Sequence, residues 1–569
     1  MPLGPVLPAL GSGAASVSAL VLAHVRARPV RVAILTVLSL VLAASAVLPS
    51  IVVARVVDTA IGGRLDLRAA VIAATAILAL AIWDAALTLA RRHLAVATEM
   101  RLRDAEATRH FRASLRLPLR AYAGGNEAAL IRSFDDLDRI VEFLAARSVE
   151  LFAETAIAVS SATLMLWVEW RLALVFVILS GLSLLTSTRL NLSARLALDA
   201  WLPVRDRRFA FIVECLTAMP TIKTLSAHSH VLAPFQAEQS LEQDRLRAWR
   251  HRQAQADSVV RFWSVATPGI GTVCGAAMLI GGAISAGDLL LFVSVSAGLG
   301  AALAGLQSHL REWHEARAGL ERMRALGMGR PEPLADAPGS EPPAPRAIHA
   351  DTISFRHPGA LRDTLDAVTL HAAAGEHIAI VGRSGEGKTT LAHILTRLLG
   401  PDRGTLTLGG TPPLPLDRHR RAVLLVPHAV TVFNATTREN VRLWDTAIDD
   451  AAIWKALDLA ALRTQVEGWD AGLDAPLGAN GNPLSAGQQQ RLGLARAFVR
   501  RPDVLILDEA TSAMDTQTEA EVLRNIRAFM HGRALIAITH RDAVAATFDR
   551  VVRIESGRAV SDPQPHHSP

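Results

Sequence analysis

The arrangement of apolar and polar positions divides the chain into two parts of different character. The first part contains six apolar stretches of about 20 residues, each long enough to cross a hydrocarbon layer of about 30 Å as a helix. Inside lipid every backbone polar group needs a partner within its own segment, and a helix provides one. The predicted spans are residues 32–54, 69–90, 148–168, 172–190, 259–284 and 289–310.

The loops between these spans indicate how the chain is oriented. Arginines precede the first span and crowd the two long loops, one between the second and third spans and one between the fourth and fifth. Because positively charged loops stay on the cytoplasmic side, we expect the N-terminus, both long loops and everything after the sixth span to be cytoplasmic. The long loops are charged and patterned, which favours helices that extend from the membrane into the cytoplasm.

After the sixth span the sequence changes twice. Residues 327–346 are rich in Pro, Gly and Ala and are predicted to be a linker. Beyond them, short apolar runs such as Ile378–Val381 and Val504–Leu507 alternate with helical stretches, which is typical of a mostly parallel α/β domain. The predicted order is a cytoplasmic lead-in (1–25), a six-helix all-α membrane domain (26–326), the linker (327–346), an α/β domain (347–560) and a disordered tail (561–569).

Composition agrees with a membrane protein. Half of the 569 residues are apolar, 20% are charged and the mean hydropathy is positive, as expected where apolar residues concentrate in spans. The net charge is +6, but the basic residues lie mainly where membrane topology alone would place them, so we predict no nucleic-acid partner. Cys215 and Cys274 have no ligand-like neighbours, which argues against a zinc site, a disulfide framework or thiol chemistry.

One glycine-rich segment matches the phosphate-binding pattern G-x-x-x-x-G-K-[ST]. It follows a predicted strand, His377–Val381, and precedes a predicted helix, Thr390–Leu399, which is the context that the motif requires. Its glycines let backbone N–H groups approach phosphates at a helix N-terminus. We expect Lys388 to reach the β- and γ-phosphates and the Thr389 hydroxyl to bind Mg²⁺. The nucleotide-binding residues here are Gly382, Arg383, Ser384, Gly385, Glu386, Gly387, Lys388, Thr389 and Thr390.

A second apolar strand, Val504–Leu507, ends in two acids. Asp508 suits Mg²⁺ coordination, directly or through water, and Glu509 stands where a general base could polarise an attacking water. A solvated acidic end of a strand would explain this pair equally well if it stood alone. The position of this acidic pair after a phosphate loop favours a catalytic role for it.

Further motifs resemble those of ATP-binding-cassette (ABC) proteins. Leu484–Arg491 is similar to the family's L-S-G-G-Q signature and lies between the two motifs above, as in the family. Asp515 belongs to a segment that looks like the family's D-loop, and His540 resembles its switch histidine. The signature residues are Leu484, Ser485, Ala486, Gly487 and Gln488.

The resemblance covers nearly all of the chain after residue 25, since Leu115–Ile140 and Glu214–Ala227 resemble the two coupling loops of exporters. It implies an exporter-type half-transporter in the bacterial inner membrane, with a P-loop ABC ATPase domain and both termini cytoplasmic. It also implies ATP and Mg²⁺ as cofactors. The implied catalytic residues are Glu509, His540 and Lys388, and the implied metal ligands are Thr389 and Asp508.

The family shares each ATP site between two cassettes. The phosphate loop of one chain and the signature of the other enclose one ATP, so Ser485 and Gly487 would contact the γ-phosphate of the partner's nucleotide. The expected partner is a second copy, forming a homodimer, or a related half-transporter, within membrane lipid. ATP binding would close the cassettes and hydrolysis would reopen them, and the coupling loops would convert this motion into alternating access.

Three positions depart from the family pattern. His357 stands where the family stacks adenine on Tyr, and it offers a smaller stacking area. His428 replaces a Gln that senses Mg²⁺ and the attacking water; a neutral imidazole can bind the metal or accept from water, with a pH dependence near about 6.5. Gly478–Gly481 lacks the acid and Arg of the usual G-E-R-G segment. These departures motivate a second hypothesis, a weakly hydrolysing regulatory or sensor subunit of a heterodimer, although Lys388 and the other residues most needed for hydrolysis are present.

The motifs do not identify the transported substrate. The spans have few aromatic residues, which disfavours an aromatic drug-binding cage, and no peptidase domain precedes the first span, which disfavours an exporter that trims leader peptides. Our hypothesis is export of a small modified or antimicrobial peptide, with a lipid or drug exporter or flippase as the alternative. An importer would usually have separate membrane and cassette chains, and a soluble DNA-acting ATPase conflicts with six apolar spans.

A few polar residues admit two interpretations. Asp84 lies within the second span, and an intramembrane acid is a functional candidate; we favour a position near the cytoplasmic end, close to Arg91 and Arg92. Glu150 and Glu154 are expected at the membrane interface. The tail residues His566 and His567 are expected to be a disordered end rather than a metal-binding tract.

Overall fold

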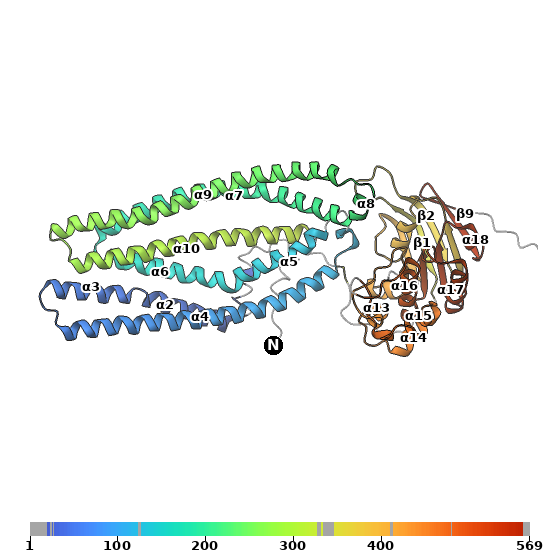
Figure 1. Ribbon diagram of the computed structural model, residues 1–569, viewed down its shortest axis with the longest axis horizontal. Coiled ribbons are helices and arrows are strands. Elements are labelled where there is room, and N and C mark those ends of the chain that lie inside the picture. The colour runs from blue at the N-terminus through green and yellow to red at the C-terminus, as the bar shows by residue number, and fades with distance from the viewer. Residues whose placement is uncertain are drawn as a thin grey trace, which may run out of the picture. The chain divides into compact units, whose positions relative to one another are not determined.

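The computed structural model describes residues 20–22, 25–26, 28–122, 127–326, 332–333, 346–409, 414–478 and 481–561 (Figure 1). The chain divides into two compact units, one of Met1–Leu115 with Gly124–Arg330 and the other of Arg116–Ala123 with Pro331–Pro569. The described part of the first unit is helical, and the second unit contains the strands.

Six helical segments of the first unit are long and apolar enough to cross a membrane, as the sequence predicts. The fifth span ends at Ile280 instead of residue 284, because Gly282 adopts a left-handed φ of +72° and the Ala283 N–H donates back to the Met278 carbonyl at 2.9 Å. The elements are α2 (Pro29–Ser45), α3 (Leu48–Ile61), α4 (Leu67–Leu115), η2 (Leu119–Ala121, in the second unit), α5 (Glu127–Glu142), η3 (Phe143–Arg147, a π-helix), α6 (Ser148–Val168), α7 (Trp170–Thr217), α8 (Met219–Thr224), α9 (His228–Ile280) and α10 (Ala286–Ala325).

The first predicted span is not one continuous helix, which corrects the expectation of a single helix over residues 32–54. It breaks between α2 and α3, at Ala46 and Val47. Pro49 has no N–H to donate to the Ser45 carbonyl four residues earlier, so the helical ladder is interrupted there. The Ser45 hydroxyl donates to the Leu42 carbonyl at 3.0 Å and so satisfies its own polar group beside the break.

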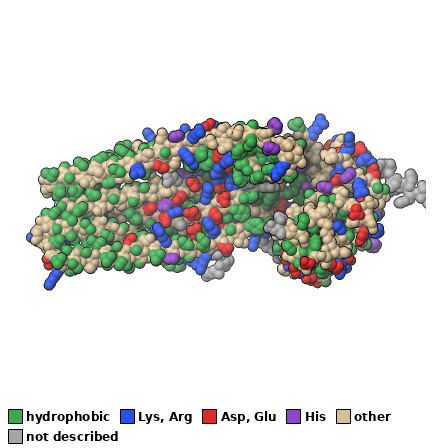
Figure 2. All heavy atoms as spheres, viewed as in Figure 1, with side chains coloured by type: hydrophobic (Ala, Val, Ile, Leu, Met, Phe, Trp, Pro, Cys, Tyr) green, Lys and Arg blue, Asp and Glu red, His purple; other side chains and the backbone are tan. Residues whose placement is uncertain are grey.

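Several helices are far longer than a membrane requires. α4, α7 and α9 have 49, 48 and 53 residues, which corresponds to about 70–80 Å at 1.5 Å per residue. The predicted helical extensions of the spans are therefore confirmed. Figure 2 shows the same division in the side chains of the first unit, where hydrophobic residues dominate one end of the helices and charged residues gather toward the other.

The second unit is built on two sheets. One has six strands in the order β5-β6-β7-β3-β8-β9, parallel except for the β8–β9 pair, and the other is antiparallel with the order β2-β1-β4. This confirms the predicted α/β class. The strands are β1 (Ile348–Phe355), β2 (Leu365–Ala372), β3 (His377–Val381), β4 (Arg403–Leu408), β5 (Val423–Val426), β6 (Val504–Asp508), β7 (Ala534–Ile538), β8 (Arg550–Glu555) and β9 (Arg558–Ser561).

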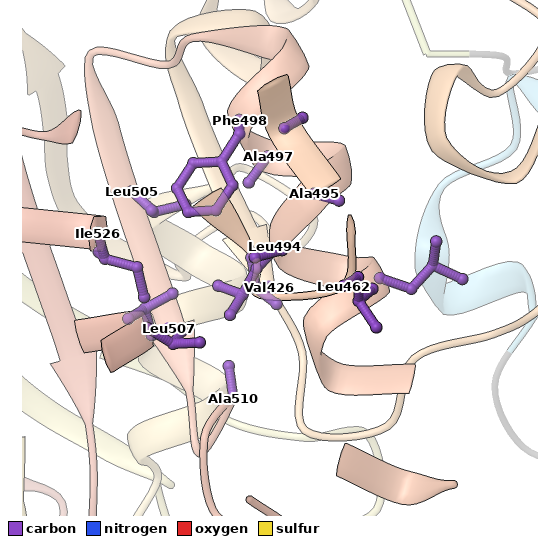
Figure 3. Close-up of a cluster of buried hydrophobic side chains, with 14 of the residues drawn as sticks. Val426, Leu462, Leu494, Ala495, Ala497, Phe498, Leu505, Leu507, Ala510 and Ile526 are labelled. Atoms are coloured by element: carbon purple, nitrogen blue, oxygen red, sulfur yellow. The ribbon is translucent and has the colours of Figure 1, made fainter. Parts of the chain in front are cut away.

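β6 is buried on both faces, which explains its unbroken apolar sequence. Val504 and Ile506 belong to a core shared with the antiparallel sheet, whereas Leu505 and Leu507 belong to a second core on the opposite face. Figure 3 shows this second core, in which Phe498 and its neighbours pack against β6. The helices around the sheets are α11 (Lys388–Leu395), α12 (Leu416–Ala422), α13 (Thr437–Arg442), α14 (Asp450–Leu459), α15 (Arg463–Glu467), η4 (Gly472–Asp474), α16 (Ala486–Arg500), α17 (Thr516–Phe529) and α18 (Asp542–Ala545).

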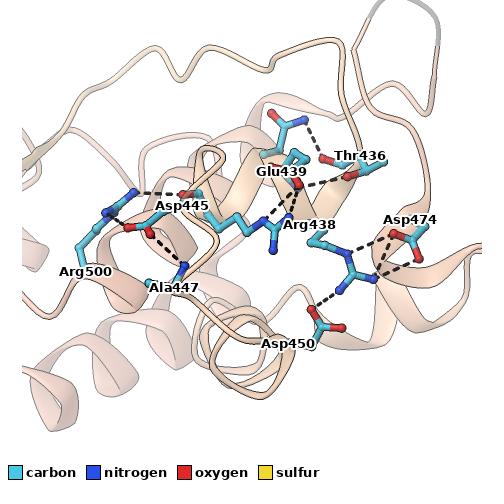
Figure 4. A network of polar contacts seen from close by, with 10 residues as sticks. Thr436, Arg438, Glu439, Asp445, Ala447, Asp450, Asp474 and Arg500 are labelled. Carbon is cyan, nitrogen blue, oxygen red and sulfur yellow. Dashed lines mark hydrogen bonds and ion pairs between the residues drawn. The ribbon is translucent and has the colours of Figure 1, made fainter. Parts of the chain in front are cut away.

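Ion pairs join the short helices α13 and α14 to their surroundings (Figure 4). Arg438 of α13 binds Asp450 at the start of α14 and Asp474 of η4, the latter at 3.1 Å. Arg500, the last residue of α16, donates to Asp445 at 2.7 Å. Exposed pairs each contribute little, but a network of several fixes the mutual orientation of the helices. The network therefore helps to hold α16, which carries the signature at its other end.

Candidate functional site

Three neighbouring strands end at one edge of the six-stranded sheet and bring the predicted nucleotide residues together. Ile538 of β7 lies opposite both Ile380 of β3 and Asp508 of β6, so the carboxyl ends of these strands are level. Ligands of open α/β sheets bind at this edge. A cavity of about 650 Å³ lies there, lined by His357, Thr364, Gly382, Ser384, Gly385, Gly387, Lys388, Thr389, Thr390, Asp508, Glu509 and His540.

The phosphate loop depends on two glycines in left-handed conformations. Gly385 and Gly387 have φ of +85° and +93°, which side chains rarely tolerate. A Cβ at Gly387 would also lie 2.8 Å from the Thr364 carbonyl oxygen. Gly387 precedes α11 without a capping side chain, so the first N–H groups of this helix are available to phosphate oxygens.

Charged side chains shape the same loop. Lys388 is buried, and its Nζ donates to the Gly382 and Arg383 carbonyls at 2.8 and 2.7 Å. Glu386 accepts from the Arg383 N–H at 2.8 Å, so its carboxylate holds the loop in shape. A phosphate oxygen could replace the two carbonyls as the partner of the lysine.

The residues present fit a magnesium ion that arrives with a nucleotide. The Thr389 hydroxyl and the buried Asp508 carboxylate line the cavity. Among the described residues, no group of three or more His, Cys, Asp or Glu could hold a metal by itself. Mg²⁺ in phosphoryl-transfer sites usually takes one or two protein oxygens and completes its shell with phosphate and water. Thr389 and Asp508 match that pattern.

Glu509 stands between two histidines. Its Oε1 lies 3.2 Å from Nδ1 of His540, and its Oε2 lies 3.8 Å from Nδ1 of His428. Glu509 has a left-handed φ of +51°, a conformation that non-glycine residues adopt mainly at constrained sites. His428 is 61% exposed in its side chain and also lies 3.5 Å from the Ser512 hydroxyl. The structure thus places His428 beside the candidate base rather than among the residues that line the cavity.

We expect ATPase activity to fall toward acidic pH, because a histidine beside the candidate base can take up a proton. A protonated His428 would pair with Glu509 and make its carboxylate a poorer proton acceptor. His428→Gln should flatten this fall, and His540 cannot explain the difference because both proteins contain it. Initial rates of ATP hydrolysis at saturating Mg-ATP, measured at a series of pH values, check the prediction. Identical profiles would show that His428 is a passive replacement.

Sequence reasoning missed two residues that support the site. Gln490 of α16 is buried, donates to the Glu509 carbonyl and the Ser512 hydroxyl, each at 3.2 Å, and accepts from the Ala513 N–H at 3.0 Å. It therefore fixes the turn that carries the candidate base. His393 on α11 is half-buried; burial lowers its pKa, Asp508 opposes this effect and His357 adds to it. His393 is therefore neutral near pH 7. The signal in the sequence that could have identified these two residues is a polar amide or imidazole side chain on an otherwise apolar helix face.

His357 is held by two contacts. Its ring meets Phe355 edge-on at 5.0 Å between centroids, and its Nε2 lies 3.3 Å from the Thr390 hydroxyl. The side chain is exposed on the cavity side, so an adenine can stack there on a small ring.

Because imidazole offers less area than phenol, we expect weak discrimination between nucleotide bases. ATP and GTP should bind with dissociation constants within about threefold of each other, and His357→Tyr should tighten ATP binding by about threefold. Titration with fluorescent analogues of both nucleotides measures this. A strong preference for ATP in the wild type would contradict it.

The signature forms the N-terminus of α16. The Ser485 hydroxyl accepts from the Gln488 N–H at 3.3 Å, and the Gln488 side chain accepts from the Ser485 N–H at 2.7 Å. Ser485 and Ala486 are exposed, Leu484 is half-buried, and a Cβ on Gly487 would lie 2.7 Å from the Ala513 carbonyl. None of these five residues lines the cavity described above.

Asp515 is the N-cap residue of α17 and accepts from the Thr518 N–H at 3.0 Å; hydrogen bonds of this kind lower its pKa. In its own chain the residue therefore acts as a helix cap. Within Gly478–Gly481, Ala479 and Asn480 lie outside the described residues, as do His566 and His567.

A chain of contacts leads from the segment between α4 and α5 to the cavity. Arg120 of η2 places its guanidinium over the Phe355 ring at 5.1 Å and lies 3.9 Å from Asp402. Phe355 in turn touches His357. Arg120 lies within Leu115–Ile140, the segment predicted to be the first coupling loop, so this segment contacts the strand that precedes His357.

Two family models match the chain. The model described as the ABC transporter transmembrane region matches residues 32–303, and the model described as ABC transporter matches residues 365–512. A Bordetella pertussis protein, the cyclolysin secretion/processing ATP-binding protein CyaB, is 29% identical over 497 residues, covering 85% of this chain and 68% of the relative. An ATP-dependent lipid A-core flippase of the same organism is 28% identical over 458 residues, covering 79% and 73%.

A solved structure of a bacterial Atm1-family ABC exporter with ATP bound has the same fold. Its TM-score is 0.75 at 21% identity, and the alignment covers 94% of this chain and 95% of that one. The two matched regions are thus fused in one chain, with the transmembrane region first. The chain belongs to the ABC exporter family, as a multi-pass inner-membrane protein that couples ATP hydrolysis to export.

Proposed function

We propose that two copies of this chain form a homodimer with two composite ATP sites that drive alternating access. One observation carries the proposal. The cavity gathers the phosphate loop, Asp508, Glu509 and His540, whereas Ser485 and Ala486 stand exposed at a helix N-terminus elsewhere on the same unit. A helix N-terminus favours anions, and a second cassette could bring its own to the γ-phosphate.

Within each site the roles follow from the geometry. Lys388 and the N–H groups of α11 would bind the phosphates. Thr389 and Asp508 would hold Mg²⁺, which would supply charge neutralisation at the phosphates. Glu509 takes the proton of the attacking water while His540, 3.2 Å from its Oε1, orients the carboxylate. Gln490 keeps this turn in place.

We further propose that both termini are cytoplasmic, because the arginine-rich long loops and the α/β unit then share one side of the membrane. Arg120 would transmit the nucleotide state to the membrane helices through Phe355.

For the substrate we propose a peptide, supported by similarity over 85% of the chain to a protein named for cyclolysin secretion. A lipid is the second candidate, because the other relative is named as a lipid A-core flippase. A regulatory subunit that hydrolyses ATP weakly is the alternative of another class, motivated by His357 and His428.

Substrate-stimulated ATPase activity of the purified chain in lipid nanodiscs separates these alternatives. Peptides from the neighbouring genes should raise turnover at least about twofold if a peptide is exported, since substrate binding biases the coupled two-state equilibrium. Stimulation by lipid A alone would favour the flippase. ATP binding without turnover in any mixture would favour the regulatory subunit.

A further inference from the structure

Glu519 is a buried acid in the first turn of α17, and it does not line the nucleotide cavity. Its Oε1 accepts from the Thr511 hydroxyl at 2.9 Å, and its Oε2 accepts from Nη1 of Arg541 at 2.5 Å. A carboxylate is costly to bury unless charged and polar groups satisfy it, and these two contacts supply such groups. Glu519 therefore joins two segments that are far apart in the chain.

The two joined segments carry the candidate base and the histidine that orients it. Thr511 lies two residues after Glu509, and Arg541 directly follows His540. Each oxygen of the Glu519 carboxylate thus binds a residue close in sequence to one member of the Glu509–His540 pair. The two members of that pair lie 3.2 Å apart, measured from Oε1 to Nδ1.

The sheet alone does not set the distance between Glu509 and His540. The ladder between β6 and β7 ends where Asp508 lies opposite Ile538. One further backbone bond runs from the Glu509 N–H to the Ile538 carbonyl at 3.0 Å, but His540 lies two residues beyond the end of β7. A cavity of about 20 Å³ is lined by both segments, so apolar packing does not fill the space there. The spacing of the pair therefore depends on polar contacts.

Other polar contacts near the pair stay within one segment. The three groups that Gln490 binds all lie in the segment after β6. The Arg541 N–H donates to the Thr539 hydroxyl at 3.1 Å, within the segment after β7. Glu519 differs from both, because its carboxylate binds one side chain from each segment.

α17 gives this carboxylate a fixed position. The helix is capped by Asp515, whose carbonyl accepts from the Glu519 N–H at 2.8 Å. Val522 and Ile526 lie three and seven residues after Glu519, on the same face of the helix, and both are buried in the core that contains Leu505 and Leu507 of β6. The helix is thus anchored to the sheet on the face from which Glu519 projects.

We infer that Glu519 is a positioning residue for ATP hydrolysis, whose carboxylate holds Glu509 and His540 at hydrogen-bond distance by binding the segments that carry them. The inference rests on the roles proposed above for these two residues and adds what keeps them together. Without the carboxylate the two segments can separate, and a displacement of about 1 Å at a reacting group costs up to about 100-fold in rate. The phosphate loop lies on β3 and α11, so ATP binding should be preserved.

Steady-state hydrolysis of Mg-ATP by the full-length chain in lipid nanodiscs tests this role. Glu519→Ala should lower kcat at least about tenfold and change the KM for ATP less than about twofold. Glu519→Gln should recover kcat to within about threefold of the wild type, because its carbonyl can accept from Arg541 and its amide can donate to the Thr511 hydroxyl. Glu521→Ala is the matched control, because Glu521 is an exposed glutamate on the same helix, and it should match the wild type.

A double substitution separates a shared link from independent effects. Arg541→Ala removes one partner of the carboxylate and should also lower kcat. A chain with both Glu519→Ala and Arg541→Ala should have a kcat within about twofold of the slower single variant, because both substitutions break the same link. Losses that multiply would show that the two residues act independently and would overturn the inference.

Thr511→Val tests the same link if Glu519→Ala does not fold. It removes the hydroxyl and leaves the carboxylate paired with Arg541, so the chain should fold while kcat falls at least about threefold. Wild-type kcat in this variant would contradict the positioning role.

Glu509→Gln, measured alongside, separates this inference from the proposed function. If Glu509→Gln is inactive and Glu519→Ala hydrolyses ATP at the wild-type rate, the positioning role is wrong and the proposed function stands. If Glu509→Gln hydrolyses ATP at the wild-type rate, the proposed base and the positioning role are both refuted.

Discussion

Replacing Glu509 by Gln is expected to reduce ATP turnover at least about 100-fold while leaving ATP binding intact. Gln keeps the size of the side chain and a hydrogen bond to His540, but it cannot accept the proton of the attacking water. The phosphate loop and the proposed Mg²⁺ ligands are unchanged, so the nucleotide should be trapped in a closed dimer. Phosphate release and retention of labelled ATP, measured on the same purified protein, check both parts.

Glu521→Gln is the matched control, because Glu521 is an exposed glutamate on α17 that lies outside the cavity. It should hydrolyse ATP at the wild-type rate. Turnover of the Glu509→Gln protein near that rate would remove Glu509 from the role of base and would point to His540 or to the substrate phosphate as the proton acceptor.

Mixing two inactive chains is expected to restore activity. A Lys388→Ala chain keeps its signature, and a Ser485→Arg chain keeps its phosphate loop, so only a mixed dimer contains a complete site. Random pairing makes half of the dimers mixed, and each has one of two sites, which predicts about one quarter of wild-type turnover. Each chain alone should be nearly inactive.

Differently tagged chains, purified in tandem, isolate the mixed dimer, which should show about one half of wild-type turnover because every dimer then has one complete site. The Ser485→Arg chain must still bind ATP through its own loop, which separates a local defect from misfolding. An inactive mixed dimer, with its formation demonstrated, would argue that both sites must work together or that the sites are not shared.

Much of this architecture could be predicted from the sequence because the determining signals are local. Six apolar runs require helices in lipid, and the apolar run of β6 reflects burial on both faces. The break between α2 and α3 has an equally local cause, because Pro49 leaves the Ser45 carbonyl without its helical donor. The expectation of one helix over residues 32–54 did not take this proline into account. The end of α9 also has a local cause, because Gly282 adopts a left-handed φ just after the helix.

Contacts between distant segments could not be predicted in this way. His428 was expected at the metal or the attacking water, whereas the fold places it 3.8 Å from Glu509, because the strands that precede these two residues, β5 and β6, are neighbours in the sheet. Gln490 and Arg120 act through carbonyl groups and an aromatic ring whose positions depend on sheet order and helix packing. Such contacts depend on tertiary structure, which no motif spacing encodes.

The central claim is that two chains share two ATP sites, and the composition of the trapped complex tests it most directly. Native mass spectrometry of the Glu509→Gln protein with ATP and Mg²⁺ measures how many chains and nucleotides stay together. The account predicts two chains of 60.8 kDa with two ATP molecules, and loss of the trapped ATP when Ser485→Arg is added. Single chains that each retain one ATP, whether or not Ser485 is intact, would contradict it.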